Sequence, residues 1–140
     1  MKTALPISFL FLLFPFVFGD AKAALEWSKK EITVAVRRDA REAVRAKFEF
    51  KNTGRKPVTV LGITTSCGCT VANAESSTVD PGKTSEVDAL FTIGNRHGRQ
   101  EKKITVSSDD PENPETILTF TIDLIEPPAG PHAGPAPLRP

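Results

Sequence analysis

Apolar and polar residues alternate with a period of two along most of this chain beyond its apolar start. The cleanest run begins at Val44, where an apolar side chain at every second position up to Phe50 alternates with a charged one. A helix would scatter these apolar groups around its axis, whereas a strand puts them all on one face. The run therefore predicts a strand with one buried face and one solvated face.

Further strands are expected wherever this period or a β-branched run recurs. These segments are 32–36, 58–63, 87–93, 102–106 and 118–124, with Trp27 just before the first of them. The polar segments between them are rich in Gly, Pro and Asn, as is typical of turns. The segment 72–78 is small and polar, and it is expected to be a loop or a short edge strand.

Three of the connecting segments carry specific turn chemistry. Asp80-Pro81-Gly82-Lys83 fits a tight turn, because proline presets φ at the first central position and glycine accepts a positive φ at the second. Asn52 and Gly54 are expected to use positive φ in the turn that follows the first run. Gly94 to Gly98 is expected to be a hairpin loop bounded by two glycines.

These elements predict an all-β fold, an antiparallel Ig-like β-sandwich of about seven strands. A chain of 140 residues has room for one domain, which is expected to occupy residues 24–126. The cysteines stand close together rather than far apart, so the core is expected to hold without a bridge between the sheets.

The two ends of the chain are expected to lie outside this domain. Residues 1–23 are predicted to be an export signal, since Lys2 precedes an apolar run too short to span a bilayer comfortably, and small residues suited to cleavage follow. An uncleaved anchor is the alternative. Residues 127–140 predict a Pro-rich disordered tail. The protein is therefore expected to be exported, to the periplasm or the extracellular space.

The charge balance bears on the class of partner. The full chain has a formal net charge of +1, and removal of residues 1–23 would take away two basic residues and one acidic residue, leaving a formally neutral chain. Such a chain, without a basic run, has no electrostatic attraction to nucleic acid or anionic lipid. We therefore expect no nucleic acid and, after signal cleavage, no membrane among its partners.

Cys67 and Cys69, the two cysteines of the chain, are the main candidates for chemistry. An export compartment is oxidising and favours a disulfide between them. Residues two apart on a strand are separated by about 6.6 Å at Cα, at the upper edge of disulfide reach, and Gly68 is expected to let the backbone close the ring. So small a ring adds little stability. It is expected to be strained and readily reduced, which makes a redox role coherent.

Two other roles for the pair stay open. Two thiolates on one face could bind a soft ion such as Cu(I), while His97 and His132 are too few and too dispersed for a full zinc set. Alternatively, the pair is a packing feature or local staple with no cofactor. His97 lies between two arginines, so it could contact an anionic ligand or simply lie in a solvated loop. No serine has a partnered histidine and acid in a recognisable order, and no enzyme activity is expected.

Three blocks in this order and spacing carry a family resemblance. They are Phe48 to Gly54, Thr65 to Thr70, and Asp80 to Lys83, and the chain resembles a bacterial family called domain of unknown function 1573. The resemblance covers roughly residues 43–126, with Cys-Gly-Cys-Thr as its most specific element. It implies an exported Ig-like sandwich, related to the small β-domains of cilia and sperm-protein scaffolds, and no established activity.

The sequence therefore favours an exported, non-catalytic binding or scaffold module with an unknown protein partner. The edges of a sandwich are natural docking sites for other strands. The alternative is a thiol-redox or Cu(I)-binding protein that acts through Cys67 and Cys69.

Overall fold

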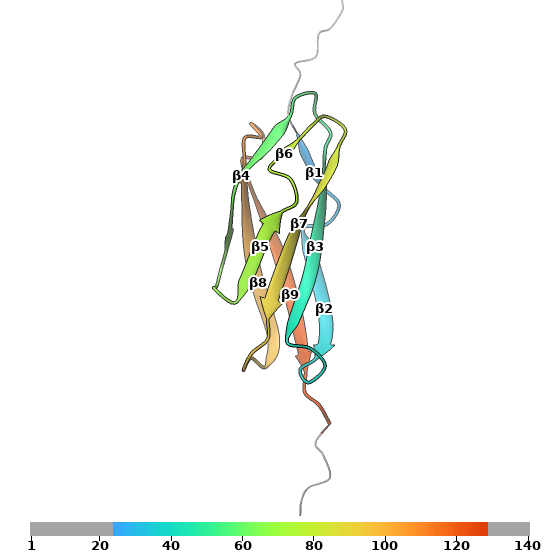
Figure 1. Ribbon diagram of the computed structural model, residues 1–140, viewed down its shortest axis with the longest axis vertical. Helices are drawn as coiled ribbons and strands as arrows, with labels where there is room; N and C mark the ends of the chain where they lie inside the picture. Colours follow the sequence, from blue (N-terminus) through green and yellow to red (C-terminus); the bar gives the residue numbers. More distant parts are fainter. Residues whose placement is uncertain (1–23, 129–140) are drawn as a thin grey trace, which may run out of the picture.

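Two β-sheets pack face to face in the computed structural model, which describes residues 24–128 (Figure 1). One sheet has four strands in the order β1 (Leu25–Trp27), β3 (Ala43–Asn52), β7 (Thr84–Thr92) and β5 (Thr70–Ala74). The other has five in the order β2 (Glu31–Arg37), β9 (Glu115–Ile125), β8 (Gly98–Ser108), β4 (Val58–Thr65) and β6 (Thr78–Val79). The predicted export signal and the tail from residue 129 onward lie outside the described residues.

The predicted fold class is confirmed, with two differences in detail. The described residues form nine strands rather than about seven, because β1, β5 and β6 are short additions at sheet edges. The strand β2 pairs with β9 in parallel, whereas every other ladder in the described part of the chain is antiparallel. Alternation along a segment determines which face is buried, but it carries no information about the direction of the neighbouring strand.

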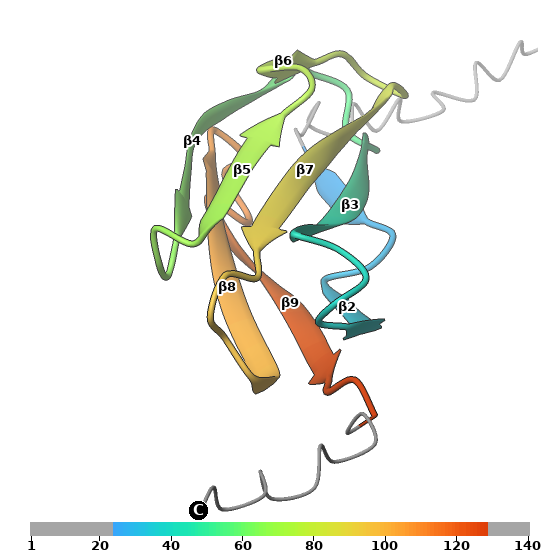
Figure 2. The ribbon, with the colours of Figure 1, turned by 60° about the horizontal axis from the view of Figure 1, so that its bottom comes forward.

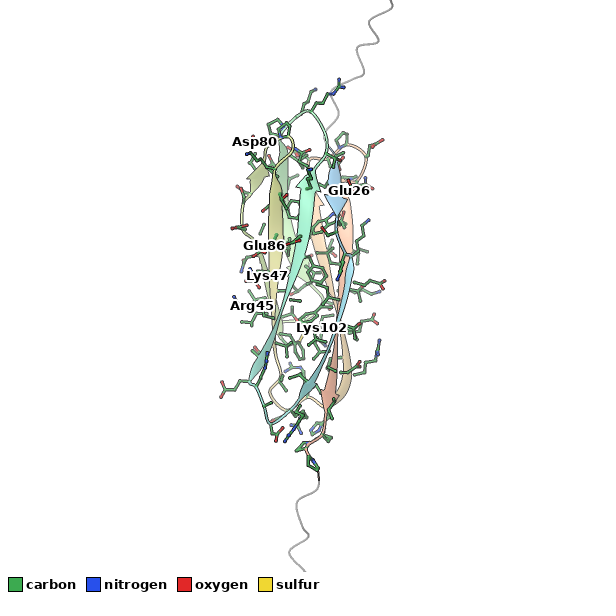
Figure 3. The ribbon with its side chains drawn as sticks, turned by 90° about the vertical axis from the view of Figure 1, so that its right-hand side faces the viewer. Glu26, Arg45, Lys47, Asp80, Glu86 and Lys102 are labelled. Carbon is green, nitrogen blue, oxygen red and sulfur yellow. A yellow bond between two sulfur atoms is a disulfide. The ribbon has the colours of Figure 1, made fainter. Side chains whose placement is uncertain are left out.

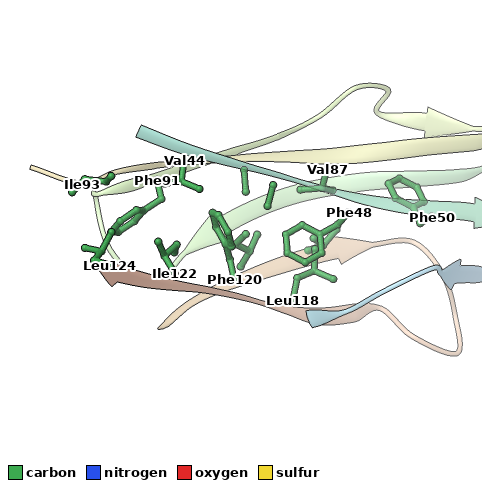
Figure 4. Packing of buried hydrophobic residues seen from close by; sticks show 14 of the residues in the cluster. Val44, Phe48, Phe50, Val87, Phe91, Ile93, Leu118, Phe120, Ile122 and Leu124 are labelled. Carbon is green, nitrogen blue, oxygen red and sulfur yellow. The ribbon is translucent and has the colours of Figure 1, made fainter. Parts of the chain in front are cut away.

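The core lies between the sheets and is built from the alternating residues of the long strands (Figure 4). The residues Val44, Ala46, Phe48 and Phe50 of β3 are all buried, as their period of two predicts. They meet the inward residues of β9, which are Leu118, Phe120, Ile122 and Leu124. Burial of this apolar surface is the dominant favourable term in folding, so the core holds the two sheets together.

The turn at Asp80 forms as predicted. Lys83 N donates a hydrogen bond to Asp80 O at 3.0 Å, and Gly82 has a φ of 76°. The turn chemistry of Pro followed by Gly is thus used as the sequence suggests.

The end of β3 is built differently from the prediction. Neither Asn52 nor Gly54 has a positive φ. Instead the fully buried Asn52 side chain donates to Lys56 O at 2.7 Å and to Val79 O at 2.8 Å, and its Oδ1 accepts from Gly54 N at 2.9 Å. Asn52 therefore shapes this turn through its amide group rather than through its backbone conformation.

The segment between Gly94 and Gly98 is not a hairpin loop, so that prediction was wrong. It joins β7 of one sheet to β8 of the other, and these two strands do not pair. Both glycines do have positive φ, at 52° and 63°. The two glycines indicate that the chain changes direction sharply. A connection between the two sheets requires such a change as much as a hairpin does, so the glycines do not distinguish the two.

Candidate functional site

The cysteine pair lies where the chain passes from one sheet to the other. Cys67 and Cys69 form a disulfide in the short crossover between β4 and β5. Their Cα atoms are 5.3 Å apart, closer than two positions along a strand, because Thr70 N donates to Cys67 O at 3.3 Å and closes a turn. The backbone therefore bends away from the strand spacing of about 6.6 Å and closes the ring, as expected.

Gly68 does not play the conformational role expected of it. Its φ is not positive, and a Cβ placed on it would meet nothing within 4 Å. The ring closes with a backbone conformation that other residues can also adopt.

Two threonine hydroxyls surround the disulfide. Thr65 Oγ1 lies 3.0 Å from Cys67 O and 2.9 Å from Thr70 O, so it joins the end of β4 to the start of β5. Thr70 is only 3% exposed, and its Oγ1 lies 3.9 Å from Cys67 Sγ and 4.0 Å from Cys69 Sγ. Both cysteines are half-buried, and Cys69 packs against the hydrophobic core. One buried hydroxyl thus faces both sulfurs.

His97 lies apart from any metal-binding set. It is exposed, and its Nδ1 lies 2.9 Å from Glu126 Oε1, so its ring pairs with a carboxylate of its own chain. Among residues 24–128 no group of three or more His, Cys, Asp or Glu side chains could hold a metal ion, and no helix there could cross a bilayer. His132 lies outside the described residues. Binding of Cu(I) by the reduced cysteines stays a prediction.

A second candidate site lies beside the crossover, on the side of the sandwich formed by β4 and β5 (Figures 1 and 2). The strand β5 ends one sheet, and the short β6 pairs with only Val58 and Thr59 of β4. Every residue from Val58 to Ala74 is uncharged, although a quarter of the whole chain is charged. Two neighbouring sheet edges are therefore both open and neutral.

The ends of the β5–β7 ladder determine which backbone groups of β5 face outward. Cys69 O accepts a hydrogen bond from β7, and Glu75 N donates one to β7, both at 2.9 Å. Hydrogen-bonded positions alternate along an antiparallel pair. The N–H and C=O groups of Ala72 and Ala74 therefore point away from β7, toward the open side.

The same logic applies to β4. Ser66 N donates to Lys103 O of β8 at 2.9 Å, which continues the β4–β8 ladder. The backbone groups of Ile63 and Thr65 therefore point away from β8. A register shift between Val60 and Gly62 leaves Leu61 as an extra residue, and its side chain is 68% exposed.

A groove of about 280 Å³ runs between these two edges. We call it the neutral groove; its lining residues are Val60, Leu61, Gly62, Ile63, Ala72, Asn73, Ala74 and Ser77. No lining residue is charged, and several of its walls are aliphatic. It offers apolar contact together with outward backbone groups of both strands.

The opposite side of the sandwich is chemically different. A hollow of about 240 Å³ there is lined by Ser28, Lys29, Ile32, Lys47 and Glu49. Beyond the short β1, the strand β3 carries Lys47, which pairs with Glu86, and Arg45, whose Nη1 lies 3.2 Å from Asp88 Oδ2 (Figure 3). Charged side chains are a common protection of sheet edges against further pairing. This side has that protection, and the neutral groove has none.

The family named "Protein of unknown function (DUF1573)" matches residues 25–123. The chain belongs to this family. No curated protein matches the sequence. The expected DUF1573 membership is thus confirmed, and the match spans nearly all the described strands.

Solved structures share the fold of this DUF1573 chain at low identity. A protein of unknown function from Porphyromonas gingivalis W83 is 17% identical with a TM-score of 0.66; the match covers 77% of this chain and 50% of that one, so this chain spans half the length of that protein. The ASH / PapD-like domain 7 of human CEP192 is 14% identical with a TM-score of 0.60, covering 88% and 99% of the two chains.

The E. coli chaperone DraB is a third match, with 14% identity, a TM-score of 0.51 and coverage of 76% of this chain and 57% of the chaperone. Parts of the VesB protease and of the secreted serine protease VesC, both from Vibrio cholerae, share the fold as well. At this identity the likeness establishes the fold alone.

The DUF1573 sequence alone does not locate the neutral groove, because the groove depends on the order of the strands in the two sheets. A usable signal was present in the uncharged stretch between Lys56 and Glu75, the longest in the described part of the chain. It gains meaning only once both of its strands are known to be sheet edges.

Proposed function

We propose that this DUF1573 chain is an exported, non-catalytic module that binds an extended segment of another protein in the neutral groove. The segment adds as a further strand to β5, and its inward side chains occupy the space between β5 and β4. The observation that carries this proposal is the pair of adjacent open edges with no charged residue. Export is supported by the predicted signal in residues 1–23 and by a disulfide, which persists in oxidising compartments.

The backbone supplies the main attraction. Added strands gain hydrogen bonds from the edge and specificity from the pockets that receive alternate side chains. The outward groups of Ala72 and Ala74 lie two residues apart, which is the spacing at which a partner strand can pair with them.

The chemistry of the groove defines the chemistry of the partner. A charged side chain placed in it would lose water and find no charged partner among the lining residues. The bound segment is therefore extended and uncharged, with small apolar residues at the positions that face inward. The chaperone and the PapD-like domain among the similar structures support a protein partner at the level of fold.

The proposal is tested by removing one outward N–H. Ala72→Pro deletes the edge donor and places a ring where the added strand would lie, while the ladder to β7 uses other residues. A matched control is Ala35→Pro on β2. There Lys30 O accepts from β9 at 2.8 Å and Arg38 N donates to β9 at 3.1 Å, so Ala35 also points its N–H outward.

The experiment first isolates the binding partner with the full exported chain and then measures its affinity for both variants. Ala72→Pro should weaken binding by about tenfold or more, which corresponds to the loss of one hydrogen bond together with a steric clash. Ala35→Pro should leave the affinity unchanged, and thermal melts should show that both variants fold. Equal affinities for the two variants, or a loss confined to Ala35→Pro, would overturn the proposal.

A further inference from the structure

The disulfide is not needed to hold the crossover in place. Hydrogen bonds of 2.9 Å anchor it on both sides, from Ser66 N to Lys103 O and from Thr92 N to Cys69 O. The ring encloses a single intervening residue, and the stabilisation from so short a loop is small. The domain is therefore expected to keep its fold when the bond is reduced, which leaves the pair free for exchange chemistry.

The two sulfurs differ in their surroundings. Cys69 packs against the hydrophobic core, and Cys67 is not part of that packing. Gly68 between them is exposed and has no side chain that could shield the bond. Access helps to determine which sulfur of a disulfide is attacked by an incoming thiolate. Because Cys69 packs against the core and Cys67 does not, Cys67 Sγ is the expected target of attack, and Cys69 is then the leaving group.

Thr70 is placed to assist that departure. Its Oγ1 lies 4.0 Å from Cys69 Sγ and 3.9 Å from Cys67 Sγ, so it is within reach of whichever sulfur becomes the thiolate, and the residue is nearly fully buried. A hydroxyl that donates to a developing thiolate stabilises the charge, and the interaction is stronger where water is excluded. A leaving thiol with a lower pKa departs faster.

We propose that Cys67–Cys69 is a thiol–disulfide exchange site for a dithiol reductant. The thiolate of the reductant attacks Cys67 Sγ, the Cys67–Cys69 bond breaks, and its electron pair goes to Cys69 Sγ. The second thiolate of the reductant then attacks the reductant's own sulfur in the mixed disulfide and releases the Cys67 thiolate. The protein pair gains two electrons and, on protonation, two protons, and the reductant becomes a disulfide. Thr70 acts as a positioning residue.

The first test traps the mixed disulfide. The probe is thioredoxin whose second active-site cysteine is replaced by serine, so that it cannot complete the reaction. Tandem mass spectrometry of the adduct should find the probe on Cys67. An oxidised peptide of residues 64–70, which lacks the core, should show no such preference. An adduct on Cys69, an even distribution in the folded protein, or no adduct at all would overturn the proposal.

The second test concerns the hydroxyl. In the reduced Cys67→Ser protein, Thr70→Val should raise the pKa of the Cys69 thiol, and in the intact pair it should slow reduction about tenfold, the usual scale of a hydrogen bond to a charged group. Thr70→Ser keeps the hydroxyl and should restore both values. If Val and Ser variants behave alike, Thr70 has no positioning role. These outcomes are independent of strand addition, since they require no binding partner.

Discussion

Asn52 and Val79 are joined inside the sandwich by a hydrogen bond of 2.8 Å, from Asn52 Nδ2 to the Val79 carbonyl oxygen. The bond ties the end of β3 in one sheet to β6 in the other. Asn52 N also donates to Lys83 O, and Asn52 O accepts from Gly82 N, so two turns and two sheets converge on one residue.

Removal of the Asn52 side chain should destabilise the domain strongly. Asn52→Ala removes the donor to the Val79 carbonyl oxygen in a buried site and the donor to the Lys56 carbonyl oxygen in a partly buried one. We expect the free energy of unfolding to fall by about 2–4 kcal/mol. Urea denaturation of the purified domain measures it. A loss below about 0.5 kcal/mol, the range of ordinary surface substitutions, would contradict this account.

Gly68 and Gly82 should respond differently to substitution by alanine. Gly68→Ala meets open space and no positive φ, so the change in stability should stay within about 0.5 kcal/mol and the disulfide should still form. Gly82→Ala forces a side chain into a φ of 76° and should cost about 1–2 kcal/mol. Thermal melts measure the stability of both variants, and a thiol assay shows whether the disulfide forms in Gly68→Ala. A larger cost at Gly68 would show that the crossover needs glycine.

Loss of the disulfide should be mild compared with loss of Asn52. The double variant Cys67→Ser and Cys69→Ser removes a very short ring, for which the chain-entropy argument gives about 1–2 kcal/mol. Urea denaturation of this variant, beside the wild type with and without reductant, provides the measurement. If the double substitution or the reduction of the wild type unfolds the domain, the disulfide is a structural staple and the exchange proposal loses its basis.

The pair of Glu126 and His97 should make a small, pH-dependent contribution to stability. The hydrogen bond with His97 is the main cause, and Arg38 a further one, that holds the pKa of the Glu126 carboxyl below its usual value. A lowered pKa in the folded state means that the contribution is present above the usual carboxyl pKa and is lost as the pH falls through the folded value. Both side chains are exposed, so the effect is weakened by solvent screening.

An NMR titration of the Glu126 carboxyl carbon tests this pair. His97→Ala should move the pKa of Glu126 upward toward the usual value, while Arg38 keeps part of the shift. An unchanged titration in the variant would show that His97 and Glu126 do not interact in solution.

The sequence was sufficient for the sandwich because alternation in segments such as Val44 to Phe50 reports burial directly. The sequence was insufficient for features that depend on contacts between residues distant in the chain. The parallel pairing of β2, the crossing of the Gly94 to Gly98 segment and the hydrogen bonds of Asn52 all require partners distant in the chain.

Each candidate site likewise has a part that the sequence could predict and a part that it could not. The position of Cys67 and Cys69 and their proximity could be predicted from a spacing of two. The buried hydroxyl of Thr70 beside both sulfurs could not, since its burial depends on how β5 packs. The neutral groove depends on the order of strands in two sheets, which no local pattern along β4 or β5 contains.

The unequal protection of the two sides limits how copies of this protein can associate. At high concentration and without a binding partner, β5 of one molecule can pair with β5 of a second. Such a pair hides both neutral grooves and presents only the sides that carry Lys29, Lys47 and Glu49. Self-association should therefore stop at two molecules, and sedimentation at rising concentration should level off at twice the monomer mass instead of running on into fibres.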